Sequence, residues 1–138
     1  MLLAVDTSTQ TIGLAIYNGW QVVCESIWQS RNHHTVEVAP AMHELMQHSG
    51  IKPGALQALA VASGPGSFTS LRIGMALIKG MALALHLPVV SLPTLDILAA
   101  GQPAQDLPMA AVLQAGRGRL AVGWYHNNGE TWESQGKA

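Results

Sequence analysis

The hydrophobic positions at the start of the chain predict three strands. Residues 1–5 form an apolar run that ends in Asp6, and residues 11–17 and 22–28 are apolar stretches of strand length. Asn18-Gly19 lies between the second and third stretches, and this dipeptide is a strong signal for a β-hairpin turn. We therefore expect the chain to open with an antiparallel three-stranded meander.

Further along, apolar residues at helical spacing alternate with short apolar runs. In residues 35–49 this spacing predicts a helix that ends at Gly50. Because Pro40 lies inside this pattern, we expect the helix either to kink there or to begin near it. The order βββαβαβα predicts an α/β fold with a mixed sheet, because right-handed βα crossovers place helices on the sheet faces. The other predicted elements are strands at residues 56–62 and 89–92 and helices at residues 71–87 and 94–100.

The character of the sequence changes after Gly101. Residues 102–108 have the composition of a linker, and apolar stretches at residues 109–113 and 120–125 flank a glycine-containing turn. These stretches predict a second meander of β-strands, which resembles the opening of another copy of the first unit. We therefore expect a first lobe over residues 1–101, a linker over residues 102–108 and a truncated second lobe over residues 109–138.

The segment GPGSFTSLRIG, residues 64–74, joins a predicted strand to the long predicted helix. A glycine-rich turn with hydroxyl groups before a helix directs backbone N–H groups toward an anion or phosphate. Its alternative role is architectural: Gly64 and Gly66 supply backbone angles that side chains forbid, and Ser67 or Thr69 caps the helix. No Gly-Lys-Ser/Thr sequence follows, so the segment is not a Walker loop.

A second group of polar residues, Asp6, Thr7 and Ser8, follows the first predicted strand. A carboxylate and hydroxyls at this place, with a hairpin returning across them, are how actin-like and ribonuclease-H-like folds present a phosphate-binding turn. The alternative is a local Asx-type turn. We expect the glycine segment to be chiefly architectural, with Phe68 filling the sheet edge and Arg72 paired with Asp6 or with a carboxylate of a partner.

Composition narrows the function classes. The chain has 138 residues, 49% of them hydrophobic, and a formal net charge of −1, which favours a well-buried core. Without a basic stripe it is not expected to bind nucleic acid non-specifically. A single cysteine, Cys24, and no signal peptide before Asp6 predict a cytoplasmic protein. Charged residues and a proline interrupt the apolar residues 71–90, which favours a buried or interface helix over a membrane span.

Three segments together resemble a known family. They are VDTST at residues 5–9, the hairpin that ends in Tyr17-Asn18-Gly19 and, above all, SGPGSFTSLRIG at residues 63–74. This combination resembles the TsaB (YeaZ) family, the non-catalytic subunit of the bacterial machinery that makes threonylcarbamoyladenosine in tRNA. The resemblance covers residues 1–100 closely and residues 109–125 more loosely.

The resemblance implies two ribonuclease-H-like lobes of the actin-like ATPase superfamily. It also implies that the chain is an obligate partner of TsaD, which transfers the threonylcarbamoyl group to adenosine 37 of ANN-decoding tRNAs, with a TsaE-like ATPase in the larger complex. Contact with tRNA is then indirect, no membrane is involved, and ATP or ADP is expected only in the complex. The family's second lobe tends to start with an Asp-Ala-Arg-Arg-Gly-like turn, whereas residues 114–118 here read QAGRG.

Two residue sets follow as candidate sites. Apolar stripes on the two first-lobe helices predict the surface that binds the partner. The resemblance implies the same surface, because in the family the equivalent helices form a bundle with those of TsaD. An isolated chain is expected to form a homodimer through this surface. The predicted partner-binding residues are Val36, Ala39, Met42, Met46, Leu71, Met75, Ile78 and Ala82. The candidate nucleotide- or anion-binding residues are Asp6, Thr7, Ser8, Gly64, Gly66, Ser67 and Thr69.

Two other function classes remain open at this point. An actin-like ATPase or small-molecule kinase needs phosphate-binding turns from two lobes and a carboxylate for magnesium, of which only the first turn and Asp6 are evident. The third class is a self-associating structural module. We expect no catalytic residue and no metal site, because the histidines lack the spacing of a ligand pair and no activated nucleophile is recognisable.

Overall fold

The first sheet is built from five strands. The structure, a computed structural model, describes residues 1–31 and 33–137; Ala138, the last residue of the predicted second lobe, lies outside them. The strands β1 (Leu2–Asp6), β2 (Thr11–Tyr17) and β3 (Val22–Gln29) form the predicted antiparallel meander. The strands β4 (Ala58–Ala62) and β5 (Val89–Leu92) extend it in parallel, giving the order β3-β2-β1-β4-β5. The predicted α/β fold class is confirmed.

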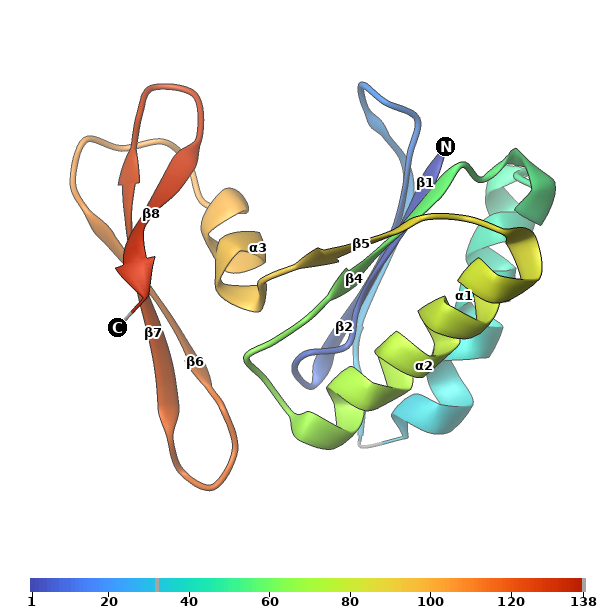
Figure 1. Cartoon of the computed structure of the whole chain (residues 1–138), viewed down its shortest axis with the longest axis horizontal. Coiled ribbons are helices and arrows are strands. Elements are labelled where there is room, and N and C mark those ends of the chain that lie inside the picture. Colours follow the sequence, from blue (N-terminus) through green and yellow to red (C-terminus); the bar gives the residue numbers. More distant parts are fainter. Residues whose placement is uncertain (32, 138) are drawn as a thin grey trace.

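Two helices cover one face of this sheet (Figure 1). The first, α1 (His34–Ser49), includes Pro40 without ending there, and its buried residues pack against the sheet. The second, α2 (Phe68–Leu85), begins three residues before the predicted start. A short 3-10 turn, η1 (Pro53–Ala55), precedes β4.

The main core lies between the first sheet and these two helices. Leu3 and Val5 on β1 and Ile12, Leu14 and Ile16 on β2 are buried at every second position, as expected for a strand with one face on the core. The helices contribute the buried side chains Val38, Met42, Leu45, Met46 and Ile78, and β4 contributes Leu59 and Val61.

The second sheet is a separate three-stranded meander of β6 (Met109–Gln114), β7 (Leu120–Asn127) and β8 (Trp132–Lys137). The short helix α3 (Thr94–Ala100) packs on one of its faces, where Ala99, Ala111 and Tyr125 form a second small core. The Tyr125 hydroxyl donates a hydrogen bond of 2.6 Å to Asp96 on α3. Burial, and then this carboxylate, raises the pKa of Tyr125 to about 12.

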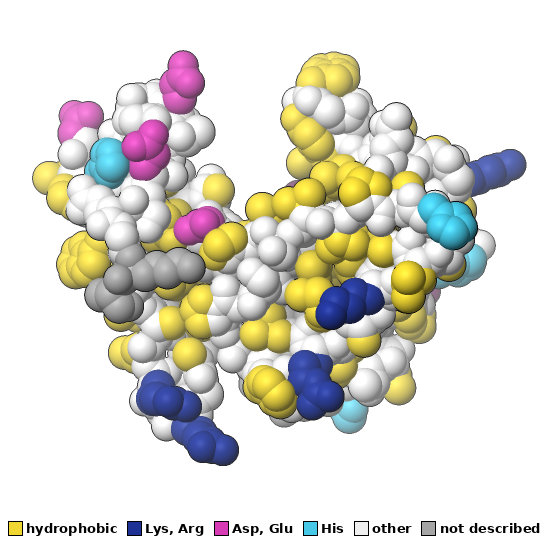
Figure 2. All heavy atoms as spheres, viewed as in Figure 1, with side chains coloured by type: hydrophobic (Ala, Val, Ile, Leu, Met, Phe, Trp, Pro, Cys, Tyr) yellow, Lys and Arg dark blue, Asp and Glu magenta, His cyan; other side chains and the backbone are white. Residues whose placement is uncertain are grey.

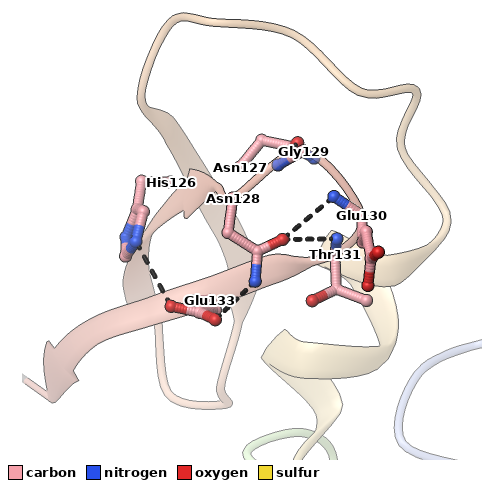
Figure 3. Close-up of polar contacts among 7 residues, drawn as sticks. All are labelled: His126, Asn127, Asn128, Gly129, Glu130, Thr131 and Glu133. Carbon is pink, nitrogen blue, oxygen red and sulfur yellow. Dashed lines mark hydrogen bonds and ion pairs between the residues drawn. The ribbon is translucent and has the colours of Figure 1, made fainter.

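Side-chain hydrogen bonds close the turn between β7 and β8 (Figure 3). The Asn128 side-chain oxygen accepts hydrogen bonds from the backbone N–H groups of Glu130 and Thr131. The imidazole of His126 lies 3.4 Å from the carboxylate of Glu133 in the ion pair beside the turn. Asparagine commonly stabilises turns in this way, so the predicted turn at residues 127–129 has a local explanation.

Candidate functional site

The residues that follow β1 form a closed turn. The Asp6 carboxylate accepts hydrogen bonds from the backbone N–H of Ser8, at 2.8 Å, and from its hydroxyl, at 2.6 Å. This is the Asx-type geometry of the architectural alternative. Thr7 and Ser8 are both buried, and the Thr7 hydroxyl donates to the Ser70 carbonyl of α2 at 2.7 Å. Asp6 Oδ1 and the hydroxyls of Thr7 and Ser8 are therefore bonded within the protein.

The glycine segment docks on that turn. The Ser67 N–H donates to the Ser8 carbonyl at 2.8 Å, and a side chain at Gly66 would collide with the same carbonyl. A side chain at Gly74 would collide with the Thr7 side chain. Gly64 has a φ of +100°, which disfavours residues with a side chain. The sequence thus brings the two predicted turns together, because only glycine permits backbones to approach this closely.

A hydroxyl-lined cavity of about 570 Å³ lies beside the start of α2. It is lined by residues 8–11, residues 67–70, Gln114 at the end of β6 and Gly116 in the turn between β6 and β7. Ser67 is the N-cap of α2 but its side chain makes no capping hydrogen bond; its hydroxyl oxygen instead accepts from the Ser70 hydroxyl at 3.0 Å. The predicted cap at Ser67 is therefore absent, and helix N-terminal N–H groups lie beside this cavity.

Phe68 differs from the prediction, and Arg72 is not paired with Asp6, whereas its pairing with a carboxylate of a partner stays a prediction. Phe68 is 74% exposed and does not fill the sheet edge. Arg72 stacks over the Phe68 ring, with its guanidinium carbon 5.3 Å from the ring centroid, whereas Asp6 bonds to Ser8. Both residues extend into solvent because they lie one helical turn apart on the outer side of α2.

The predicted partner-binding residues divide into two groups. Met42, Met46 and Ile78 are buried in the main core, which corrects their placement on a partner surface. Val36 and Ala39 are exposed on α1, and the α2 residues Leu71, Met75 and Ala82 are half-buried. The sequence could not separate these groups, because α2 is apolar around most of its circumference.

The structure also adds exposed apolar residues that the pattern did not indicate. On α2 these are Phe68 and Leu83, which are 74% and 78% exposed. Val36 on α1, which was predicted as a partner-binding residue, is 67% exposed. Figure 2 shows hydrophobic side chains over the exposed side of the helices, interrupted by few charged groups. We call Val36, Ala39, Phe68, Met75, Ala82 and Leu83 the helical face.

The helix α2 is long and apolar enough to cross a membrane by length and composition. Core helices of soluble proteins also meet this criterion.

Neighbouring side chains shift the pKa of one carboxylate on α1, that of Glu37. The Glu37 carboxylate has a lowered pKa because of hydrogen bonds from Ser30 and from the Trp28 indole, which lies 3.2 Å away. His33, which precedes α1, and His34, its first residue, add a smaller effect that also lowers this pKa. Within residues 1–31 and 33–137, no three His, Cys, Asp or Glu side chains come together as metal ligands.

Comparison with known proteins gives consistent matches. A family model described as TsaD, tRNA N6-adenosine threonylcarbamoyltransferase, matches residues 22–137. The tRNA threonylcarbamoyladenosine biosynthesis protein TsaB of Bacillus subtilis is 36% identical over 129 residues, which cover 93% of this chain and 56% of that protein. A tRNA N6-adenosine threonylcarbamoyltransferase of Nitratidesulfovibrio vulgaris is 42% identical over 74 residues, 52% of this chain and 20% of that protein.

A solved structure extends the match to the fold. YeaZ from Pseudomonas aeruginosa superposes with a TM-score of 0.89 at 28% identity, covering 99% of this chain and 64% of that one. The chain therefore spans a little over half the length of the Bacillus subtilis relative and under two thirds of the superposed structure.

Proposed function

Because the chain belongs to the TsaB (YeaZ) family, we propose that it takes part in the biosynthesis of threonylcarbamoyladenosine in tRNA as a non-catalytic subunit. In this role it binds and supports a TsaD-type transferase, which forms the modification at position 37 of ANN-decoding tRNAs. The observation that carries the proposal is the helical face, where Val36, Phe68 and Leu83 are each at least two thirds exposed. Phe68 and Leu83 lie at opposite ends of α2, and large exposed apolar residues along a helix are typical of protein interaction sites.

The homology between the chain and a transferase supports a helical interface. Part of this chain is 42% identical to a threonylcarbamoyltransferase, so the partner carries a related segment. Two related lobes can pack the equivalent helices against each other about an approximate twofold axis. The same face is nearly self-complementary, and the isolated chain is therefore expected to form a homodimer through it.

The proposal also covers tRNA, the other proteins of the complex and the location in the cell. The chain has seven Lys and Arg against eight Asp and Glu, so tRNA contacts are expected from the transferase instead. A TsaE-like ATPase belongs to the larger complex, and no membrane is required. The proposed location is the cytoplasm, where this tRNA modification takes place.

The experiment is a binding measurement with the TsaD-type transferase of the same organism. Val36→Glu and Leu83→Glu each place a charge in the helical face and are expected to weaken binding by about tenfold or more, while circular dichroism stays unchanged. The matched control is Ile27→Glu, because Ile27 is 66% exposed on β3, away from both helices. Full binding by both helical variants, or loss only with Ile27→Glu, would contradict the proposal.

The hydroxyl-lined cavity supports a second candidate function, the binding of a nucleotide by an actin-like ATPase lobe. Residues from both sheets line it, as such a site requires. Against it, the Asp6 carboxylate is bonded to Ser8. We expect calorimetry with ATP or ADP and magnesium to show no low-micromolar binding to the chain alone. Such binding, lost in Ser67→Trp and accompanied by ATP hydrolysis, would favour the ATPase.

A further inference from the structure

A further cavity of about 570 Å³ lies beside α3, the helix that stands between the two sheets (Figure 1). It is lined by Gly64 and Pro65 after β4, by Leu95 and Asp96 on α3 and by residues 120–123 of β7. None of its described lining residues belongs to the hydroxyl-lined cavity. Its volume lies in the range of about 300–1,000 Å³ that is typical of small-molecule sites. We call it the α3 pocket.

The polar side chains of the α3 pocket present oxygen atoms. The Tyr125 hydroxyl donates its hydrogen bond of 2.6 Å to Asp96 Oδ1, so Oδ2 and the phenol oxygen can each still accept one. Ser134 is the cross-strand partner of Tyr125, and its side chain therefore lies on the same face of the second sheet. Asp96, Tyr125 and Ser134 together provide three hydrogen-bond acceptors.

The charge of the α3 pocket is negative. Among its described lining residues Asp96 is the one charged side chain, and no lysine, arginine or histidine accompanies it there. A carboxylate without a neighbouring cation attracts a cation and repels an anion. A primary ammonium group carries three N–H donors and no acceptor, so it matches this set of oxygens in both charge and hydrogen bonding.

The remainder of the α3 pocket is apolar and well ordered. Pro65, Pro93 and Leu95 contribute hydrophobic surface, and two of them are prolines with restricted backbones. Tyr125 is 3% exposed, and its ring packs over Gly123, where an added Cβ would lie 3.0 Å from a ring carbon. The phenol oxygen is therefore held in place before any ligand arrives, which lowers the entropic cost of binding.

We propose that the α3 pocket binds a small organic cation, a primary ammonium group carried on an apolar body. The ammonium group lies against the oxygens of Asp96, Tyr125 and Ser134, and the apolar body packs against Pro65 and Leu95. The binding is non-covalent. It uses no residue of the helical face and does not depend on the proposed function.

The test uses phenethylamine, which joins a primary ammonium group to an apolar ring. Binding to the 138-residue chain is measured by calorimetry and by shifts of backbone amide NMR signals near neutral pH. Two matched probes change the polar group: phenethyl alcohol is neutral, and 3-phenylpropionate is an anion. We expect the amine to bind at least tenfold more tightly than the alcohol, the anion not to bind measurably, and the amine to shift the signals of Asp96, Gly123 and Ser134.

Two substitutions locate the site. Asp96→Asn removes the charge but keeps an oxygen that accepts from Tyr125, so it should weaken binding of the amine at least tenfold without unfolding the chain. Its matched control is Asp106→Asn, which removes an equal charge from the exposed linker and should leave binding unchanged. Ala121→Phe fills the pocket from β7 and should also abolish binding.

The outcomes that overturn the proposal are distinct. Absence of binding by phenethylamine overturns it, as does equal binding by the amine and the alcohol. Binding that Asp96→Asn leaves unchanged overturns it even if Ala121→Phe does not fold. Nα-acetyl-lysine amide serves as a further probe. Tighter binding of this probe than of phenethylamine would assign the pocket to a lysine side chain of a protein partner and would also overturn the proposal.

Discussion

The chain contains two three-stranded meanders, β1–β3 and β6–β8, whose surroundings differ. Alternate residues of β1 and β2 are almost completely buried under α1 and α2. In β6–β8, by contrast, α3 covers one face, and three apolar side chains on the other face are exposed: Val112 by 49%, Trp124 by 50% and Leu120 by 67%. We therefore expect the two meanders to differ in stability, because different elements cover them. The first meander belongs to the main core, and the second depends on one short helix.

The largest expected effect disrupts the first region where Gly74 of α2 lies against the Thr7 side chain. Gly74→Ala places a methyl group against the buried Thr7 side chain and disturbs the Thr7–Ser70 hydrogen bond, so we expect a loss of about 2–4 kcal/mol in the free energy of unfolding. Gly80→Ala in the same helix meets no atom within 4 Å and should stabilise by about 0.5–1 kcal/mol. Urea denaturation measures both. Equal effects would show that the contact with Thr7 is unimportant.

A smaller change tests the second region. Tyr125→Phe removes the hydrogen bond to Asp96, and we expect a loss of about 1–2 kcal/mol, with faster amide exchange confined to α3 and β6–β8. The control is Tyr17→Phe, because the Tyr17 hydroxyl bonds only to the Gly19 carbonyl on an exposed hairpin. Faster exchange throughout β1 and β4 would mean that the two regions unfold as one unit.

The same tyrosine predicts a dependence on alkaline pH. Its pKa is raised from 10 to about 12, so the folded state retains the proton that the unfolded state loses. The stability due to this group is fully present below pH 10 and declines as the pH rises through 12. We expect Tyr125→Phe to lack this part of the decline in urea unfolding at pH 9 to 12. Identical profiles for both proteins would contradict the assignment.

The smallest expected effect concerns the outer side of α2. Arg72→Ala removes the stacking on Phe68 and should cost about 0.5–1 kcal/mol, because the pair is exposed to solvent. Lys79→Ala, exposed on the same helix, is the matched control and should cost less. A loss above about 2 kcal/mol for Arg72→Ala would mean that this side of α2 is more tightly packed than its exposure indicates.

The sequence by itself determined the elements and their order. Apolar runs of strand length predicted β1 and β2, and Asn18-Gly19 predicted the hairpin between β2 and β3, because these signals act over a few neighbouring residues. In the glycine segment, Gly64 has the backbone angle that the sequence predicted, whereas the close approach of Gly66 to Ser8 was not predicted. The residues of this segment also carried the resemblance to the family. Local conformational preference and strand periodicity are sufficient for all of these.

Only the tertiary structure decided which side of each helix is buried and what the polar groups bond to. Ile78 and Leu83 are both apolar residues of α2, yet one is in the core and the other is 78% exposed. Helical spacing alone could not distinguish them, because an almost uniformly apolar helix has no polar side to define its orientation. Likewise, Asp6 bonds to Ser8 two residues away, whereas Arg72 stacks on Phe68. Each outcome depends on the distances that the fold sets between residues, which the order of residues does not contain.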